Sequence, residues 1–333
     1  MDILTIKPAA VAIAVLMLPV FACIGAAEPE SSSPLASRPI TLVVPFAAGG
    51  GTDILARLVA KKLETSTRHT VIVDNKPGAN GLIASQFVAR ATPDGHTLVL
   101  GSNSTHVIAP LLSPDKLAME TTKNSFAIIS VLASTPLVLA VSGKSEYENL
   151  DQFLNAKPDG GLTYGTFGAG SSAHLMGALL AARRGSRLLH VPYKGSSSAI
   201  TDLLGRNIDS VFLTVAAVGA YVDGGQIRPL AVTGTERVQT LPGVPTFGER
   251  GIAGLENAGW FAVFAPAKTP DNIVSYLRGK LRDAMSEPDM QAKLPELGLQ
   301  RKSEASDDMA IWNGSVAGTL EILRQAKIHL DEK

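Results

Sequence analysis

Short β-branched runs alternate with segments of helical periodicity along almost the whole chain. The clearest pair comes early: residues 40–44 have strand character, and apolar residues recur at helical spacing from Ile54 to Leu63. The alternation continues with short connections to residue 101 and begins again between residues 162 and 232. This order is typical of parallel α/β sheets, so the sequence predicts two such series.

The two series predict two lobes that interrupt one another. A chain of 333 residues is too long for one ordinary core. Two apolar runs broken at Pro136 indicate a crossover, and the run 260–264 indicates a return to the first lobe. We therefore expect lobe 1 at 38–140 and 257–333, and lobe 2 at 141–256. Open α/β sheets bind ligands beyond the carboxyl ends of their strands, so two facing lobes predict a cleft.

The N-terminus has the pattern of an export signal. Residues 1–27 combine a thin basic start, an apolar stretch and small residues before a cleavage point, and the apolar stretch is too short for a permanent bilayer span. An uncleaved anchor and lipidation at Cys23 remain alternatives. Residues 28–37 predict a flexible leader. Cys23 is the only cysteine, so cleavage after residue 27 leaves no thiol for a disulfide, a metal site or a nucleophile.

The balance of positive and negative residues argues against a nucleic-acid partner. Lys+Arg and Asp+Glu both number 30, whereas a nucleic-acid binder needs a basic face. The six histidines show no H-E-x-x-H or related spacing, so no zinc site is supported. We expect no metal, no cofactor and no nucleic acid, and a monomeric protein.

The first strand leads into a glycine-rich loop, residues 45–53, and then a helix. Consecutive glycines bring backbone N–H groups close to a ligand, and a helix N-terminus favours an anion. Thr52 or Asp53 is expected as the N-cap. Because an ionised carboxylate repels an anion, Asp53 is assigned mainly to capping and to an i,i+4 pair with Arg57. We expect Gly50→Val to block the close approach of the backbone to a ligand.

The second series opens on a similar device. Thr166 leads into the loop 167–172, where Ser171 and Ser172 add hydroxyl donors, and a helix follows. His174 lies in the first turn of that helix, where we expect a capping or packing role. Two such loops, one for each lobe, predict a hinged clamp for a small anion. His190, in an apolar strand, is interpreted as a core or hinge residue.

Catalytic and nucleotide motifs do not fit these loops. A P-loop requires G-x-x-x-x-G-K followed by Ser or Thr, and no Lys follows either glycine cluster. A dinucleotide fingerprint requires a third glycine where Ile54 stands. A hydrolase using Ser171 with His174 lacks the G-x-S-x-G elbow. The sequence therefore predicts a binding protein and not an enzyme.

Residues that follow two further strands are also candidates for ligand contact, because they too lie at strand ends that can face the cleft. Asn103 and Thr105 follow the strand 97–101, and Tyr193 follows the strand 189–191. Lys194 either supplies charge to an anionic ligand or is a solvated lysine.

An ordered set of motifs covers nearly all of the chain after the signal. These are Arg38-Pro39-Ile40, Pro45-Phe46 to Asp53, Asn75 to Gly81, Pro93 to Leu98, Tyr164-Gly165-Thr166 to Leu175, Val191 to Gly195, Leu230 to Thr233 and Leu241 to Thr246. In their order and spacing the chain strongly resembles the Bug-type substrate-binding proteins of tripartite tricarboxylate transporters. His96, Phe167 and Ala178 depart from the family pattern, and Phe167 lies within the second loop.

The resemblance implies a periplasmic receptor with two α/β lobes, a periplasmic-binding-protein-like fold of type II, which close on a ligand between them. It implies that two loops, Phe46 to Asp53 and Thr166 to Ser171, hold a carboxylate through backbone amides, hydroxyl groups and bridging water. It also implies delivery to a membrane complex of one small and one large subunit. The candidate ligand-binding residues are Phe46, Ala48, Gly49, Gly50, Thr52, Asp53, Asn103, Thr105, Thr166, Ala169, Gly170, Ser171, His174 and Tyr193.

The function predicted from these patterns is capture of a small mono- or dicarboxylate in the periplasm for such a transporter. A periplasmic sensing subunit that signals to a membrane kinase is the alternative. Both need the same closed surface of the two lobes, so the sequence leaves them open.

Overall fold

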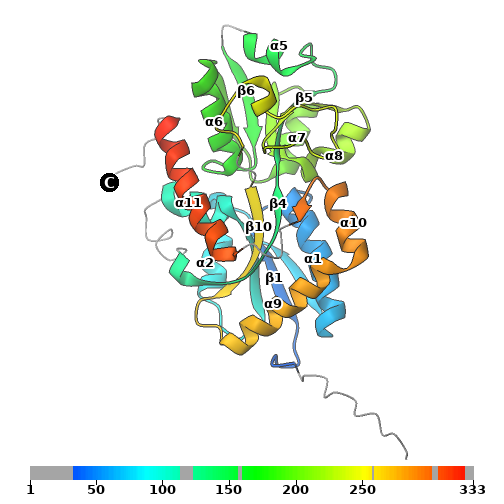
Figure 1. Cartoon of the computed structure of the whole chain (residues 1–333), viewed down its shortest axis with the longest axis vertical. Coiled ribbons are helices and arrows are strands. Elements are labelled where there is room, and N and C mark those ends of the chain that lie inside the picture. Colours follow the sequence, from blue (N-terminus) through cyan, green and yellow to red (C-terminus); the bar gives the residue numbers. More distant parts are fainter. Residues whose placement is uncertain (1–32, 113–122, 157–159, 257–258, 302–306, 327–333) are drawn as a thin grey trace, which may run out of the picture. The chain divides into compact units, whose positions relative to one another are not determined.

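Two sheets, each flanked by helices, make up the described chain, as the computed structural model shows (Figure 1). The structure describes residues 33–112, 123–156, 160–256, 259–301 and 307–326. The predicted signal peptide, Cys23 and the first half of the predicted leader, residues 28–32, lie outside these residues. The prediction of an α/β fold with two lobes is confirmed.

The first sheet is mixed, with the strand order β11-β4-β10-β3-β1-β2. Strand β1 is parallel to β2 and β3, whereas β10 is antiparallel to β3 and β4. The expectation of a purely parallel sheet was wrong for β10, because this strand returns from the second sheet and enters from the opposite end. The strands are β1 (Ile40–Val44), β2 (Val71–Asn75), β3 (Thr97–Ser102), β4 (Phe126–Thr135), β10 (Gly259–Pro266) and β11 (Gln300–Arg301).

The second sheet repeats this arrangement in the order β7-β6-β8-β5-β9. Here β5 is antiparallel to β8 and β9, and β6 is parallel to β7 and β8. In each sheet, the antiparallel strand in the interior is the one that the chain enters on crossing from the other sheet. The strands are β5 (Leu137–Ser142), β6 (Leu162–Thr166), β7 (Leu188–Pro192), β8 (Ser210–Thr214) and β9 (Ile227–Val232).

Helices fill the connections between the strands. The longer ones are α1 (Gly51–Thr67), α2 (Leu82–Ala89), α6 (Ser172–Arg184), α7 (Ser196–Leu204), α8 (Val215–Asp223), α9 (Asp271–Ser286), α10 (Pro288–Glu296) and α11 (Asp308–Gln325). The short ones are η1 (Ala79–Gly81), η2 (Ser104–Ile108), α3 (Ala109–Leu112), η3 (Lys123–Ser125), α5 (Leu150–Asn155) and η4 (Gly248–Arg250).

Both faces of the first sheet are buried. Leu42 and Leu98 belong to the hydrophobic cluster that α1 and α9 cover, and their neighbours Val43 and Val99 belong to the cluster on the opposite face, all with no exposed surface. Alternate side chains of one strand therefore reach different cores, which is why these strands read as continuous apolar runs. Burial of one such side chain contributes about 1.5–3 kcal/mol.

The chain leaves the first sheet at Pro136, since β4 ends at Thr135 and β5 begins at Leu137. Helix α11 packs against both sheets: Trp312 joins the core of the first, and Ile322 joins the core of the second. We propose the lobes suggested by the sequence with this first crossing just before residue 140. On this proposal, α11 bridges the two lobes.

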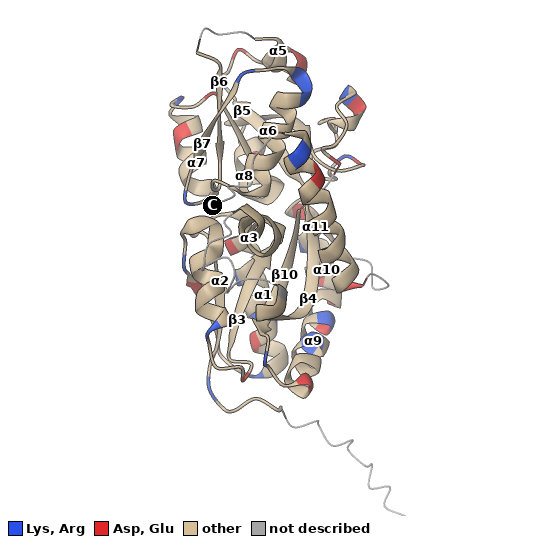
Figure 2. Cartoon of the chain, turned by 90° about the vertical axis from the view of Figure 1, so that its left-hand side faces the viewer, with Lys and Arg blue, Asp and Glu red and all other residues tan. Residues whose placement is uncertain are grey.

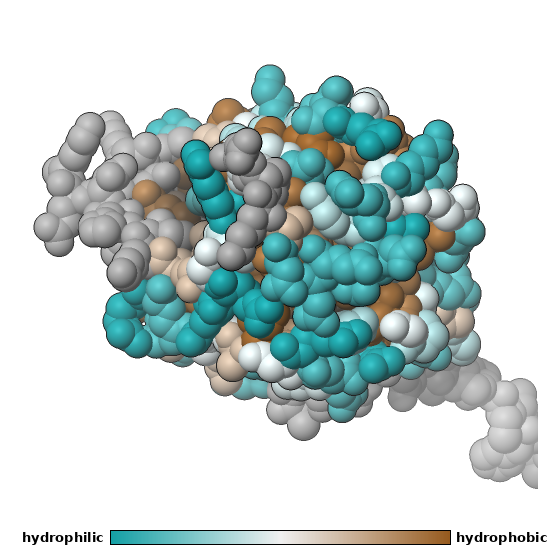
Figure 3. Space-filling view, turned by 90° about the horizontal axis from the view of Figure 1, so that it is seen from above, coloured by the Kyte–Doolittle hydropathy of each residue, from teal (hydrophilic) through white to brown (hydrophobic). Residues whose placement is uncertain are grey.

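Charged residues of both signs occur on outer helices such as α9 and α11, and neither sign forms a broad patch in the view of Figure 2. Seen from the end formed by the second sheet, the surface is mostly hydrophilic with apolar residues scattered between (Figure 3). Among the described residues, no helix combines the length and apolar character that a bilayer crossing requires.

Candidate functional site

Four helices of the described chain begin around one small cavity, which we call the inner pocket. Gly51, Ser172 and Ser196 are the first residues of α1, α6 and α7, and Thr214 is the N-cap of α8. The residues lining it are Phe46, Gly50, Gly51, Thr52, Ser102, Asn103, Ser104, Thr135, Leu137, Phe167, Ser172, Ser196, Thr214 and Phe261. Strands and helices of both sheets contribute to this lining.

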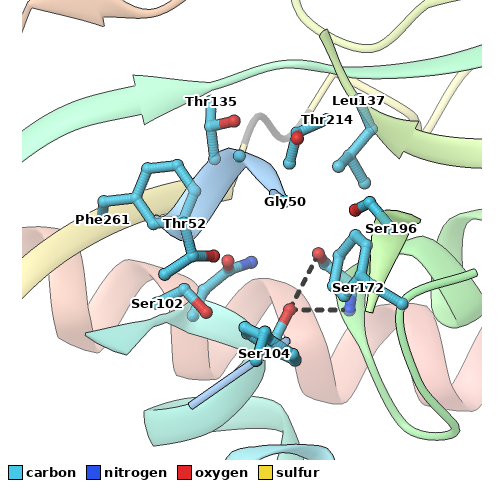
Figure 4. Close-up of a pocket in the computed structure, with 14 residues that line it drawn as sticks. Gly50, Thr52, Ser102, Ser104, Thr135, Leu137, Ser172, Ser196, Thr214 and Phe261 are labelled. Carbon is cyan, nitrogen blue, oxygen red and sulfur yellow. Dashed lines mark hydrogen bonds between the residues drawn. The ribbon is translucent and has the colours of Figure 1, made fainter. Parts of the chain in front are cut away.

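The lining residues of the inner pocket are uncharged. Seven of its lining residues carry hydroxyl groups, and none of the described lining residues carries a formal charge. Figure 4 shows these hydroxyl side chains arranged around the cavity. The hydroxyl groups of Thr135 and Thr214 are buried and have no hydrogen-bond partner. A buried hydroxyl without a partner costs free energy, so a polar group that reached either hydroxyl would recover that cost.

The helix termini give the inner pocket a positive potential without a cation. Each helix N-terminus carries about half a positive charge in its unpaired backbone N–H groups. The N-caps of α1, α7 and α8, which are Gly50, Gly195 and Thr214, provide no side-chain cap. Helix α6 differs, because the Ser171 side chain accepts a hydrogen bond from His174 N. The arrangement suits an anion recognised by amides and hydroxyl groups.

One pair of serines joins the two sides of the inner pocket. The backbone N–H of Ser172 donates to Ser104 Oγ at 3.0 Å, and Ser104 Oγ donates to Ser172 Oγ at 2.9 Å. Both bonds appear in Figure 4. Ser104 follows β3 of the first sheet, and Ser172 begins α6 of the second. These bonds therefore hold the two sides together.

Two aromatic rings separate the inner pocket from a larger one. Phe46 and Phe167 meet edge to face, with ring centroids 5.5 Å apart, and both line both pockets. The inner pocket offers about 20 Å³ to the centre of a water-sized sphere, which is room for one or two water molecules.

The larger cavity, which we call the outer pocket, offers about 450 Å³ by the same measure. Its lining comes from the loops 78–82 and 167–170, from α3 and from the end of β7, and consists of Phe46, Gly78, Ala79, Asn80, Gly81, Leu82, Ala109, Leu112, Phe167, Gly168, Ala169, Gly170, Pro192, Tyr193 and Lys194. Lys194 is the one charged residue in this described lining. Both polar atoms of the Asn80 amide are buried and without a partner.

The Asp53 carboxylate is held by hydrogen bonds within and beside the first loop. Its carboxylate accepts hydrogen bonds from Gly49 N, Arg57 and Asn75, each at 3.0 Å. Burial by itself raises the pKa of the Asp53 carboxyl, but the bonds from Arg57, Gly49 and Asn75 outweigh burial and lower that pKa below its usual value. The expected pair with Arg57 is present, whereas the N-cap is Gly50 and neither Thr52 nor Asp53. Asp53 instead folds the loop back onto the helix.

Two stacked histidine rings, His174 and His190, contact the second loop through Gly170 and Thr166. His174 and His190 stack with their centroids 3.9 Å apart. His174 Nδ1 accepts from Gly170 N at 3.1 Å, and His190 Nε2 lies 2.7 Å from Thr166 Oγ1. Burial lowers the pKa of both imidazoles, that of His190 to about 3 with His174 as a lesser cause. Both rings are therefore neutral at pH 7 and act as packed supports, as expected from the sequence.

The predicted site residues fall into three groups. Phe46, Gly50, Thr52 and Asn103 line the inner pocket. Phe46, Ala169, Gly170 and Tyr193 line the outer pocket, where Tyr193 Oη donates to Asp202 at 2.6 Å. The others support the loops from outside both linings, and they are Ala48, Gly49, Asp53, Thr105, Thr166, Ser171 and His174. The Thr105 hydroxyl, for example, accepts from Ser102 N at 2.9 Å.

Several residues that line the inner pocket were not among the site residues predicted from the sequence. Ser196 and Thr214 begin helices α7 and α8, and Thr135 and Leu137 flank the crossing at Pro136. The available signal was the recurrence of Ser or Thr where a strand passes into a helix.

The position that most strictly requires glycine is Gly51, one residue after Gly50, where the sequence predicted a close approach of the backbone. A Cβ on Gly50 would lie 3.7 Å from its nearest neighbours, which is ordinary contact, and the backbone there is extended. A Cβ on Gly51 would lie 2.4 Å from Thr214 Oγ1. Gly51 is therefore the position where the first loop approaches the other side of the pocket.

Metal binding finds no support in the described residues, where no group of three or more His, Cys, Asp or Glu side chains is arranged to hold an ion.

The sequence matches a known receptor family and is similar to several of its relatives. The family model described as the tripartite tricarboxylate transporter family receptor matches residues 55–319. The UPF0065 protein in the tcbD-tcbE intergenic region of Pseudomonas sp. (strain P51) is 37% identical over 277 residues, which are 82% of each chain. Protein BugT of Bordetella pertussis is 31% identical over 306 residues, covering 89% of this chain and 93% of BugT.

Solved structures agree with the sequence comparison. The periplasmic binding protein BugD superposes with a TM-score of 0.80 at 30% identity, covering 88% of this chain and 99% of BugD. Rpa4515 of R. palustris with adipate gives 0.81 at 31% identity, covering 87% and 98%. MatC from Rhodopseudomonas palustris with bound malate gives 0.78 at 27% identity, covering 87% and 99%.

Proposed function

Because the chain belongs to the tripartite tricarboxylate transporter receptor family, as its motifs predicted, we propose that it captures a small carboxylate for a transporter of that type. Receptors of this family are periplasmic solute-binding proteins. The prediction that the chain is not an enzyme is confirmed by this membership. The identity of the carboxylate, export by residues 1–27, and delivery to a two-subunit membrane complex belong to the proposal.

The observation that carries the proposal is the convergence of four helix N-termini on an uncharged, hydroxyl-lined pocket. A carboxylate placed there meets amide and hydroxyl donors from both sides, including the unpaired hydroxyls of Thr135 and Thr214. A buried Lys or Arg would bind any anion strongly, whereas directed amides and hydroxyls favour the planar geometry of one group. Relatives with adipate and with malate support this ligand class.

Binding to purified protein tests the proposal. We expect adipate, malate or a related acid to raise the melting temperature, with a gain of about 2.7 kcal/mol in unfolding free energy at a hundredfold excess over Kd. The diamides of the same acids serve as neutral controls, and they should have little effect. The absence of any shift or heat of binding across mono-, di- and tricarboxylates would contradict the proposal.

A further inference from the structure

The side chain of Asn80 packs across the boundary between the two sides of the pockets. Asn80 lies in η1, in the loop that follows β2 of the first sheet, whereas its amide packs against the second loop. A Cβ added to Gly168 would lie 3.2 Å from Asn80 Oδ1, and a Cβ added to Gly170 would lie 3.6 Å from Asn80 Nδ2. Because both positions are glycine, the second loop leaves the space that the amide fills.

The Asn80 amide gains no hydrogen bond from this contact. Its Nδ2 and Oδ1 atoms are both buried, and neither has a partner among the described residues. The second loop uses its own polar groups internally: Gly168 N donates to Thr166 Oγ1 at 3.2 Å, and the Thr166 hydroxyl donates to Gly168 O at 3.1 Å. Gly170 N donates to His174 Nδ1 at 3.1 Å. The hydrogen bonds that shape the second loop therefore leave the Asn80 amide unpaired.

Separation of the two sides would satisfy the Asn80 amide, whereas a ligand would not. Although Asn80 borders the outer pocket, its amide atoms have no surface open to that pocket. Water reaches both atoms once the second loop moves away, and a polar group that exchanges water for no partner raises the free energy. Contact between the two sides therefore carries an unfavourable contribution at Asn80.

A favourable contribution acts against this one at the same boundary. The hydrogen bonds between Ser104 and Ser172 form only when the two sides meet. Contact thus makes hydrogen bonds at the serine pair and leaves the Asn80 amide without any. Two opposing terms at one boundary make the contact between the sides adjustable by a single residue.

We propose that Asn80 opposes contact between the two sides and thereby sets the fraction of ligand-free molecules that are closed, that is, with the two sides in contact. The buried amide disfavours the closed form, so its removal increases the closed fraction. The consequence for affinity rests on the proposed function: a carboxylate held by donors from both sides binds only closed molecules, so its apparent Kd rises as the closed fraction falls.

Two substitutions change the amide in opposite directions and fit the backbone. Asn80 has a φ of 48°, a conformation that glycine adopts freely and that aspartate tolerates about as well as asparagine. Asn80→Gly removes the buried polar group, so it should favour contact. Asn80→Asp places a carboxylate between Gly168 and Gly170, and a buried charge costs more than a buried amide, so it should favour separation.

Small-angle X-ray scattering of the ligand-free proteins at pH 7 gives the first readout. We expect a larger radius of gyration for Asn80→Asp than for Asn80→Gly. This ranking holds wherever wild type lies between closed and separated, because the two variants shift the balance in opposite directions. Arg206→Gly is the matched control: Arg206 has a φ of 60°, is exposed and lines neither pocket, so glycine there should leave the radius unchanged.

Affinity gives the second readout, measured by calorimetry with adipate and malate. Asn80→Gly should bind these acids about fivefold more tightly than wild type, because more of the ligand-free protein is already closed. A residue that only supported its loop would give the opposite sign, since glycine would make the loop more flexible and weaken binding. Circular dichroism and urea unfolding establish that each variant is folded before the comparison.

The two readouts separate this inference from the proposed function. Equal radii for Asn80→Gly and Asn80→Asp overturn the inference, whether or not a carboxylate binds. Weaker binding by Asn80→Gly also overturns it, because Asn80 would then support the site. If neither acid binds any of these proteins, the proposed function loses its support, and the scattering comparison still decides the role of Asn80. A larger radius for Asn80→Asp together with tighter binding by Asn80→Gly supports the inference.

Discussion

Ser104 and Ser172 are joined across the inner pocket by two hydrogen bonds, although they are 68 residues apart in sequence. One serine follows a strand of the first sheet and the other begins a helix of the second. Both side chains are buried. Because each bond links one side of the pocket to the other, the pair stabilises the contact between the two sides, and not the fold of either side.

Removal of this link should open the protein. In Ser104→Ala the Ser172 N–H loses its acceptor, and a buried unpaired donor costs about 1–3 kcal/mol unless water reaches it. The least costly response is separation of the two sides. We expect small-angle X-ray scattering of the ligand-free variant to give a larger radius of gyration than wild type.

Ser85→Ala is the matched control for this comparison. Ser85 is fully buried in α2, and its hydroxyl has no partner, so its removal should not change the radius of gyration. Equal scattering from wild type and Ser104→Ala would show that the serine pair does not hold the two sides together.

Thr214→Val should raise stability while weakening binding. The Thr214 hydroxyl is buried without a partner and makes no cap bond to α8. Valine has nearly the same shape, so its introduction removes an unpaired polar group at little cost in packing. We expect the unfolding free energy of the ligand-free protein to rise by about 1 kcal/mol in urea titrations, and carboxylate affinity to fall.

Thr269→Val provides the opposite case. Thr269 is similarly buried, but its hydroxyl donates to Pro266 O at 2.7 Å, so valine there should lower stability. If Thr214→Val also lowered stability and left binding intact, the hydroxyl would have a structural partner and no ligand role.

The order of strands and the two glycine-rich loops could be predicted because their signals are local. A β-branched run followed by glycine and then helical spacing identifies a strand, a turn and a helix N-terminus within one stretch of sequence. Phe46, Gly50 and Thr52 were predicted in this way. The antiparallel placement of β10 was not, because it depends on the end from which a distant segment enters the sheet.

Residues that meet only through the fold were beyond prediction. Thr214 is an ordinary threonine at the end of β8, and its importance comes from its contact with Gly51, which lies far away in sequence. The same holds for α11: its apolar positions predict a helix but do not say that Trp312 joins one core and Ile322 the other. Non-local contacts of this kind leave no periodic pattern.

The contact between Gly51 and Thr214 leads to a test of the glycine positions. Gly51→Ala places a Cβ 2.4 Å from Thr214 Oγ1, whereas the Cβ of Gly50→Ala has ordinary contacts at 3.7 Å. We expect Gly51→Ala to reduce carboxylate affinity more than tenfold by forcing the two sides apart. Gly50→Ala should bind within about threefold of wild type. A reversed ranking in calorimetric titrations would mean that the ligand approaches Gly50 and not Gly51.

Asp53 should stabilise the first loop only in its charged form. Asp53→Asn removes the ionic part of the contacts with Arg57, and we expect the unfolding free energy at pH 7 to fall by about 1–2 kcal/mol. The pKa of Asp53 is lowered in the folded protein, so its contribution is complete above the unfolded-state pKa near 3.9 and is lost as the pH falls through the folded-state pKa. The deficit of the variant, measured by denaturant unfolding, should therefore shrink below about pH 4.

Asp151→Asn is the control for Asp53, because its pair with Arg250 is exposed and 3.6 Å long. Such pairs contribute about 0–1 kcal/mol, so this variant should remain close to wild type. A deficit for Asp53→Asn no larger than that for Asp151→Asn would remove the carboxylate from its assigned role in the loop.

The histidine pair behind the second loop should make stability depend on pH. The pKa of His190 is about 3 in the folded protein, mainly because of burial and secondarily because of His174, whereas an unfolded histidine titrates near 6.5. As the pH falls, the unfolded chain takes up the proton first, so stability present above about pH 6.5 is progressively lost toward pH 3. Between pH 7 and pH 5 one fully buried imidazole would account for about 2 kcal/mol of unfolding free energy, and partial exposure of His190 reduces this to about 1 kcal/mol.

His190→Gln keeps a hydrogen-bonding group near Thr166 and cannot be protonated, so the decrease in unfolding free energy from pH 7 to pH 5 should be about 1 kcal/mol smaller than in wild type. Equal decreases in urea titrations of the two proteins would show that His190 is already charged in the fold, and the stacked pair would then not be a neutral support for the loop.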